Sequence, residues 1–265
     1  MQTHFIRVPL CLLALVLALS SAHADGDYEA DVDGFHLRLD EYRQDVVRLL
    51  DCADEIAAAY SNDADDEASV QKLIDLWEEV AVHGAIERKA SILYPPVWQA
   101  ISKLQQALKT DAGEADLQAA QDDLAVALWQ GLGGVTLAAN QYEQGMQEVA
   151  APAAPEGDYA EQIAAIRDEL EQAVQAYADN DVKQAEKLVY AAYMQRFEFL
   201  EADLIAQDAE LVEKLELDFN AGLPQLMQQG ADVAAVREKL AKMNAELDQA
   251  AALLAASEAN RSEVF

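Results

Sequence analysis

Beyond about residue 30 the sequence is dominated by residues that favour α-helices, and this constrains the fold more than any other feature. Alanine, leucine, glutamate and glutamine are abundant, and no convincing run of alternating β-branched residues occurs. Polar or Pro/Gly-containing breaks divide the helical stretches, at Asn62–Asp66, Pro95-Pro96, Thr110–Gly113, Gly131–Gly134 and 150–157. We expect the proline pair to end one helix and the glycine-rich segment to interrupt or end another. The chain is therefore predicted to be all-α.

The second half repeats the pattern of the first. Its breaks predict four helices at about 158–178, 182–206, 209–228 and 232–257, with Asp208 as an N-cap and Gly230 as a C-cap. Ile86-Glu87 matches Leu200-Glu201, and other matching pairs keep an offset of about 114 to 117 residues. We predict an internal duplication that forms two tandem up-down four-helix bundles, at 31–148 and 158–258, joined by a Pro/Ala linker at 149–157. One continuous pseudo-twofold array is the alternative.

Residues 1–24 have the pattern of a secretory signal peptide. Arg7 supplies the positive charge, Val8–Leu19 the short apolar segment, and Ala22-His23-Ala24 a cleavage site of small residues. Cleavage after Ala24 predicts a periplasmic protein. No other stretch is apolar enough to span a bilayer, so we expect no membrane insertion after the signal is removed. Cys52 is then the single cysteine, and we expect a packed thiol.

The formal net charge of the chain is -31. So strong an acidic balance argues against nucleic acid or an anionic lipid surface as a partner. It favours cations or a basic protein, although solvated acidic helix faces would give the same composition.

Two carboxylates occupy positions where an apolar residue is expected. Glu201 lies on the apolar stripe of its helix, and Glu87 occupies the matching position in the first half. A buried carboxylate is costly unless it is paired, protonated or bound to a metal. The repetition indicates that these positions have a role.

The second half contains two E-x-x-E pairs on successive helices. Glu198 and Glu201 form one pair, and Glu213 and Glu216 form the other. A tight turn at Gln207-Asp208 would make the two helices antiparallel neighbours, so the pairs could converge. Converging carboxylates suit hard cations such as Fe³⁺, Mn²⁺, Ca²⁺ and Mg²⁺. Ordinary ion pairs with nearby arginine and lysine are the alternative.

The first half offers Glu79, His83 and Glu87, spaced four residues apart along one face of a continuous helix. Imidazole with carboxylates suits iron, manganese, zinc or copper. A core histidine bonded to a glutamate, or a protonated carboxyl network, would fit the same pattern. The chain has no E-x-x-H motif, nucleophile elbow, phosphate loop or zinc-protease helix, so we predict no enzymatic activity.

One stretch of the second half carries a distinctive set of residues, namely Tyr177, Asn180-Asp181, Ala185, Ala192-Tyr193-Met194, Phe197-Glu198-x-x-Glu201 and Leu215-Glu216-x-x-Phe219. This stretch resembles the extracytoplasmic helical domain associated with bacterial high-affinity, oxidase-dependent iron permeases. The resemblance covers about 100 residues well. The transmembrane helices of that family are absent, and its R-E-x-x-E motif has an inserted residue here, at Arg196-Phe197-Glu198. The resemblance implies an exported accessory of an iron uptake system, with an iron permease subunit or another uptake protein as partner.

The leading hypothesis is therefore a periplasmic module that binds iron or a similar divalent cation. A metal-free helical interaction module with an acidic docking surface is the alternative, and a metal oxidase is a third, weaker one.

Overall fold

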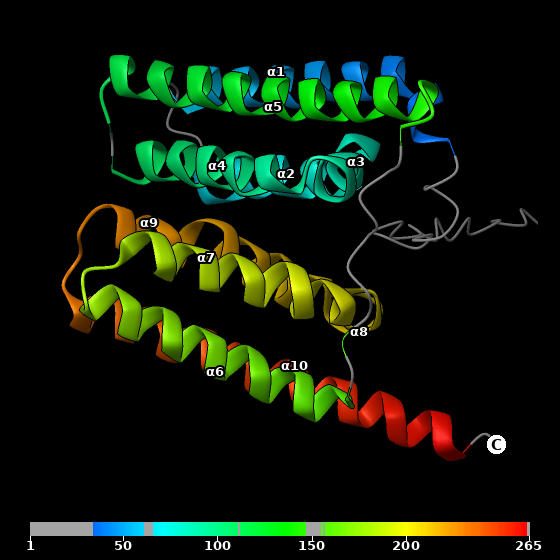
Figure 1. Cartoon of the computed structure of the whole chain (residues 1–265). Coiled ribbons are helices and arrows are strands. Elements are labelled where there is room, and N and C mark those ends of the chain that lie inside the picture. The colour runs from blue at the N-terminus through cyan, green and yellow to red at the C-terminus, as the bar shows by residue number, and fades with distance from the viewer. Residues whose placement is uncertain (1–33, 61–65, 111, 147–154, 156, 264–265) are drawn as a thin grey trace, which may run out of the picture.

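The computed structural model describes residues 34–60, 66–110, 112–146, 155 and 157–263 (Figure 1). The predicted signal peptide and nearly all of the predicted Pro/Ala linker lie outside these residues. Within the described residues all regular secondary structure is helical and there is no strand, which confirms the all-α prediction. None of the helices described is both long and apolar enough to cross a membrane.

The helices of the first half, with short 3-10 turns, are η1 Phe35–Leu37, α1 Leu39–Tyr60, α2 Asp66–Glu79, α3 Ala81–Lys89, η2 Ser91–Leu93, α4 Tyr94–Lys109 and α5 Glu114–Glu143. Those of the second half, with two π-helical turns, are α6 Tyr159–Ala178, α7 Val182–Ala192, η3 Tyr193–Phe197, α8 Glu198–Leu217, η4 Asp218–Gly222, α9 Leu223–Gln228 and α10 Val233–Glu263.

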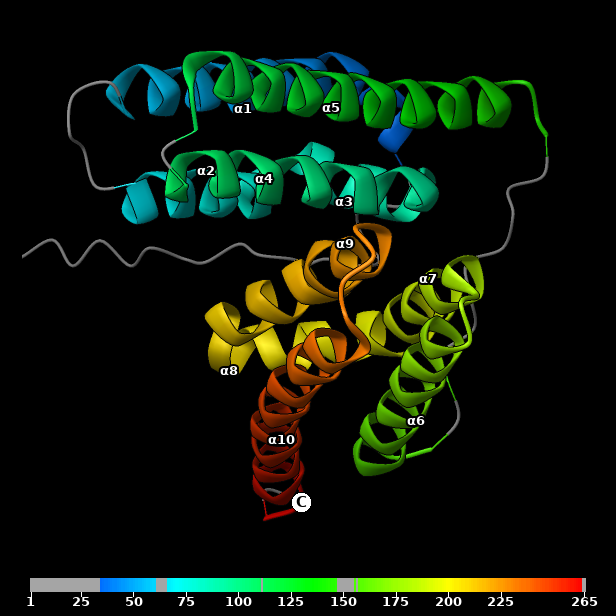
Figure 2. The same ribbon diagram turned by 90° about the vertical axis from the view of Figure 1, so that its left-hand side faces the viewer.

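The helices stack in four layers. In Figure 1, α1 and α5 form one outer layer, followed by α2, α3 and α4, then α7, α8 and α9, and finally α6 and α10. Figure 2 shows that the helices of the second half cross those of the first at a steep angle. The two halves therefore meet through their inner layers, and α4 packs against η4.

The interface between the halves is part of the hydrophobic core. Tyr94 of the first half stacks on Tyr193 of the second, with ring centroids 5.9 Å apart. Gln99 of α4 donates to the carbonyl of Asn220 at 3.2 Å. Burial of apolar surface on both sides of this seam holds the halves together. Cys52 packs half-buried against the same core, and burial raises the pKa of its thiol.

The predicted boundaries of the second half agree closely with the structure, except that α10 continues to Glu263, beyond the predicted end near residue 257. The chain leaves helical geometry within α8 at Asp208, whose Oδ1 accepts a hydrogen bond from the Leu211 amide at 3.1 Å. Gly230 follows α9 with a φ of 71°, the left-handed conformation that suits a glycine C-cap. Asp208 and Gly230 thus confirm the predicted caps.

Two predicted helix breaks in the first half are wrong. Pro95 and Pro96 do not end a helix; they occupy the first turn of α4, where the missing amide hydrogens cost nothing. The segment Gly131–Gly134 does not interrupt a helix either, because α5 continues through it to Glu143. A Cβ at Gly134 would lie 2.7 Å from the Cβ of Ala90, and one at Gly131 would lie 2.5 Å from Cδ1 of Ile86. These two glycines permit close contact between α5 and the segment that begins with α3.

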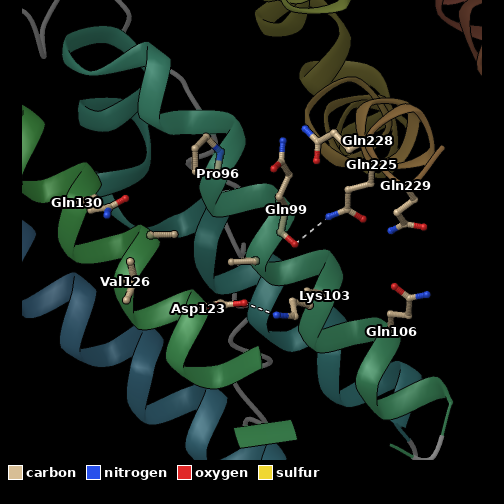
Figure 3. A pocket seen from close by; sticks show the side chains of 12 residues that line it. Pro96, Gln99, Lys103, Gln106, Asp123, Val126, Gln130, Gln225, Gln228 and Gln229 are labelled. Carbon is tan, nitrogen blue, oxygen red and sulfur yellow. Dashed lines mark hydrogen bonds and ion pairs between the residues drawn. The ribbon is translucent and has the colours of Figure 1, made fainter. Parts of the chain in front are cut away.

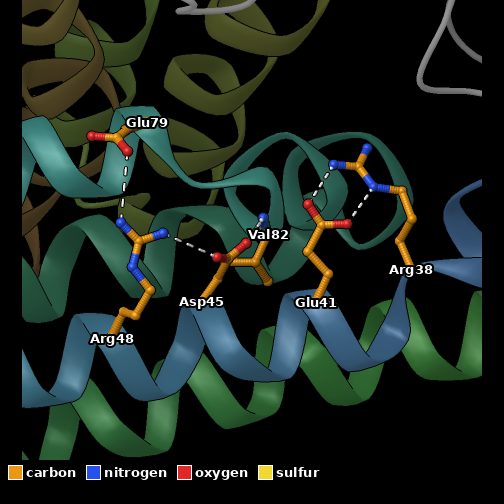
Figure 4. Close-up of polar contacts among 6 residues, drawn as sticks. All are labelled: Arg38, Glu41, Asp45, Arg48, Glu79 and Val82. Atoms are coloured by element: carbon orange, nitrogen blue, oxygen red, sulfur yellow. Dashed lines mark hydrogen bonds and ion pairs between the residues drawn. The ribbon is translucent and has the colours of Figure 1, made fainter.

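Helix α3 is anchored by a side chain from α1. It has no side-chain cap of its own, and Val80 breaks the chain before it with a ψ of 142°. Asp45 of α1 instead accepts a hydrogen bond from the Val82 amide at 3.2 Å, and Arg48 lies 3.5 Å from the same carboxylate (Figure 4). Burial raises the pKa of Asp45, and the Val82 amide opposes that shift. This contact fixes the start of the helix that carries His83 and Glu87.

Candidate metal centre

Three buried carboxylates meet where the two halves join. Glu87 of α3 and Glu201 and Glu216 of α8 each offer an oxygen, and these oxygens all lie within 4.8 Å of one another. The three residues are 1%, 3% and 2% exposed, respectively. A straight helix would place residues 201 and 216 about 22 Å apart. The break at Asp208 turns the chain back and brings them together.

A second group of ligating side chains adjoins the first. Glu78, His83 and Glu216 also offer ligand atoms within 4.8 Å of one another. Nδ1 of His83 lies 3.7 Å from Oε2 of Glu78, and its Nε2 lies 2.7 Å from the Tyr94 hydroxyl. The imidazole packs against the Trp77 ring, with centroids 4.7 Å apart, which fixes its orientation. Glu216 belongs to both groups.

Two tyrosine hydroxyls connect these groups. Tyr94 donates to Oε1 of Glu216 at 2.6 Å. The Tyr193 hydroxyl lies 2.8 Å from the same oxygen and 2.6 Å from Oε1 of Glu87. A phenol carries one proton, so Tyr193 cannot donate to both carboxylates at once. The Tyr193 hydroxyl therefore links an oxygen of Glu87 and an oxygen of Glu216 through a single proton.

The environment keeps both phenols protonated. Burial raises the pKa of Tyr94 and of Tyr193 well above the ordinary value for tyrosine, and the nearby glutamates raise it further. The hydroxyls therefore remain donors across the physiological pH range. The same carboxylates, when ionised, give the site a negative charge that attracts cations.

Irregular backbone positions these residues. The break at Val80 separates Glu78 on α2 from His83 on α3. Tyr193 opens the π-helical turn η3, and Glu216 lies just before the second π-helical turn, η4. Single π-helical turns inside α-helices occur frequently at functional sites. In the first half, the prolines that begin α4 fix the position of Tyr94.

The structure brings together His83, Glu87, Glu201 and Glu216, four of the seven residues predicted as ligands. It combines them into one cluster shared by the halves, whereas the sequence placed candidate ligands in each half and left open whether the halves bind separately. Glu198 is half-buried on α8 and, among the described residues, does not join either group of ligand atoms.

Glu79 and Glu213 lie away from the cluster. The expected single face for Glu79, His83 and Glu87 is wrong because the helix breaks at Val80. The Glu79 side chain is 70% exposed and lies 3.6 Å from Arg48 (Figure 4). Glu213 accepts a hydrogen bond from Gln71 at 2.9 Å, and burial raises its pKa.

Three residues of the cluster were missed from the sequence: Glu78, Tyr94 and Tyr193. Glu78 joins the cluster instead of the neighbouring Glu79 because the helix breaks at Val80. The residue at the break is a valine, not a proline or glycine, so the residue type did not signal it. The two tyrosines lie among apolar residues, and a buried phenol needs a hydrogen-bond partner. The sequence could therefore have predicted that each tyrosine has a buried hydrogen-bond partner, but not which residue that partner is.

A separate groove of about 460 Å³ lies on the surface between α4, α5 and α9 (Figure 3). Its wall carries an ion pair between Lys103 and Asp123, and Gln225 donates to the Gln99 carbonyl at 3.0 Å. Its remaining lining residues are Pro96, Ala100, Gln106, Val126, Ala127, Gln130, Gln228 and Gln229. No residue of the carboxylate cluster lines this groove.

No protein-family model, curated protein or solved structure matches the chain. The chemistry of the cluster therefore has to be judged from its own geometry. Carboxylate oxygens with one imidazole are the donor set of iron, manganese and zinc sites.

Proposed function

We propose that the protein binds iron, or a similar cation, at the buried cluster of Glu87, Glu201 and Glu216, with His83 and Glu78 beside it. The observation that carries this proposal is that three nearly fully buried glutamates each bring a carboxylate oxygen within 4.8 Å of the others. Carboxylates brought together in a dry interior repel each other, and a bound cation removes both the repulsion and the desolvation penalty. Donor type favours a hard or borderline cation.

The biological setting of this proposal is an exported accessory of an iron-permease uptake system. It is supported by the sequence resemblance of the second half, by the predicted signal peptide and by the acidic charge of the chain. The proposed partner is a permease subunit or another uptake protein. Internal duplication belongs to the same proposal and is supported by the matched residues Glu87 and Glu201, which both reach the cluster.

Substitution of one cluster carboxylate tests the function. We expect Glu201→Gln to weaken Fe²⁺ or Mn²⁺ binding in equilibrium dialysis by more than about tenfold. Glu213→Gln is the matched control, because Glu213 lies in α8 beyond the break at Asp208 and outside the cluster. Elemental analysis of protein purified from the periplasm without chelator identifies the cation.

Thermal unfolding gives a second measurement on the same variants. In metal-free protein, Glu201→Gln should raise the melting temperature by about 2–4 °C for each kcal/mol of relieved repulsion. Added cation should then raise the melting temperature of the wild type more than that of the variant. Unchanged cation binding in Glu201→Gln would instead favour the metal-free interaction module, with the cluster held by a proton.

A further inference from the structure

We propose that the cluster holds two cations, bridged by the carboxylate of Glu216; this inference rests on the proposed function. Two sets of ligand atoms are present, Glu78–His83–Glu216 and Glu87–Glu201–Glu216, and each meets the same 4.8 Å limit. Glu216 is the member common to both. A carboxylate has two oxygens, so one glutamate can serve two neighbouring cations.

The two positions differ in chemistry. The first combines an imidazole nitrogen with two carboxylates, a donor set that suits Fe²⁺, Mn²⁺ or Zn²⁺. The second offers carboxylate oxygens alone, from Glu87, Glu201 and Glu216, and therefore prefers a harder cation. The ligand class is thus a pair of cations, with a first-row transition-metal ion in the position that includes His83 and a harder ion in the all-oxygen position.

Contacts around Glu216 hold its side chain between the two groups and leave its second oxygen out of these hydrogen bonds. The hydroxyls of Tyr94 and Tyr193 both lie within hydrogen-bond distance of Oε1, and each also contacts one of the two groups. Tyr94 contacts His83 at 2.7 Å, and Tyr193 contacts Glu87 at 2.6 Å. The two rings stack nearly parallel, at 9°, so the hydroxyls are held as a pair. Glu216 is therefore fixed between the positions by one residue from each half.

Charge also favours two cations over one. The cluster contains four carboxylates, from Glu78, Glu87, Glu201 and Glu216. It also contains His83, which is only 6% exposed. A single divalent ion neutralises two of these charges. Two divalent ions would balance the four carboxylates in their ionised form, with a neutral imidazole.

Mn²⁺ titration of the full chain, followed by equilibrium dialysis and electron paramagnetic resonance, tests this inference. The wild type should bind about two Mn²⁺ per chain and give the spectrum of an exchange-coupled pair. His83→Ala and Glu78→Gln should each retain about one Mn²⁺ with the spectrum of an isolated ion, because the all-oxygen position survives. Glu216→Gln should weaken both positions by more than about tenfold.

Glu79→Gln and Glu213→Gln are the matched controls, since they remove one carboxylate next to Glu78 and one near Glu216 without touching either ligand group. Both should keep about two coupled Mn²⁺. Circular dichroism verifies that every variant stays folded. One Mn²⁺ per wild-type chain at saturation, or two ions without coupling, would overturn the bridged pair but leave the proposed function intact. Absence of any bound Mn²⁺ or Fe²⁺ would overturn both.

Discussion

The two halves of the molecule deliver residues to the same cluster by different structural means. In the first half, the chain breaks at Val80, and α3 depends on other helices for its position: Asp45 of α1 caps it, and glycines of α5 pack against it. In the second half, the corresponding turn is the π-helical turn Tyr193–Phe197, where the helix continues without a break. The first half is therefore positioned by tertiary contacts and the second by local backbone geometry.

The caps repeat this contrast. In the second half, Asp158 and Asp181 each cap their own helix by accepting a hydrogen bond from the amide three residues later, at 2.9 and 3.1 Å.

The last long helices of the two halves also differ. Helix α10 of the second half contains no glycine, whereas α5 of the first half contains Gly131, Gly133 and Gly134. A substitution in a helix remote from the cluster should therefore disturb the cluster more when that helix belongs to the first half than when it belongs to the second.

The largest expected effect concerns the glycines of α5. Gly134→Ala should lower the free energy of unfolding by about 1–3 kcal/mol, because its Cβ would collide with the Cβ of Ala90, which has no rotamer to move to. Gly133→Ala, at the neighbouring position, should raise it by about 0.5–1 kcal/mol, since nothing lies within 4 Å and alanine favours the helix. Urea denaturation measures both. Effects of the same sign would show that close contact with α5 does not hold this region.

A smaller difference is expected between the two kinds of helix cap. Asp45→Ala should cost about 2 kcal/mol, at the upper end of the range for caps, because the Val82 amide is left buried and the contact with Arg48 is lost. Asp158→Ala should cost only about 0.5–1 kcal/mol, because its cap is exposed. Denaturant unfolding of the two variants gives the comparison. Equal losses of unfolding free energy in the two variants would contradict a difference between a cap supplied by another helix and a cap supplied by the helix itself.

The smallest expected effect on the free energy of unfolding should appear only at alkaline pH, and it depends on one buried tyrosine from each half. The pKa values of Tyr94 and Tyr193 are raised in the folded protein, so the folded state retains protons that the unfolded state loses above a pH of about 10. Their contribution to stability is fully present below that pH and is lost as pH rises through and above it. Tyr94→Phe and Tyr193→Phe should each make the fall in stability shallower, by up to about 1.4 kcal/mol per pH unit.

Unfolding free energies measured between about pH 9 and 11 test this linkage. Tyr142→Phe removes an exposed tyrosine at the end of α5 and serves as the control. A slope that is the same in Tyr94→Phe, Tyr193→Phe and the wild type would contradict a linked pair of phenols at the seam.

Much of the second half could be predicted from sequence because its signals are local. Asp208 and Gly230 act on the backbone within a few residues of themselves, so a turn and a cap follow directly from residue type. The turn then predicts that Glu201 and Glu216 approach each other, as they do. Local signals misled in the first half, where Pro95-Pro96 begins a helix and Gly134 serves packing between helices. A proline can begin or end a helix, and a glycine can interrupt a helix or allow close packing. The residue type is the same in each case, so only the contacts with neighbouring helices distinguish the two roles.

The sequence by itself determined that the chain is helical and that Glu87 and Glu201 occupy apolar stripes, because helical periodicity is a property of neighbouring residues. The tertiary structure decided which carboxylates share a site. It joined His83 and Glu87 to Glu201 and Glu216 across the seam, added Glu78, Tyr94 and Tyr193, and left Glu79 and Glu213 outside. The orientation of one half on the other depends on burying the apolar surface of α4 and η4, and no spacing along the chain encodes it.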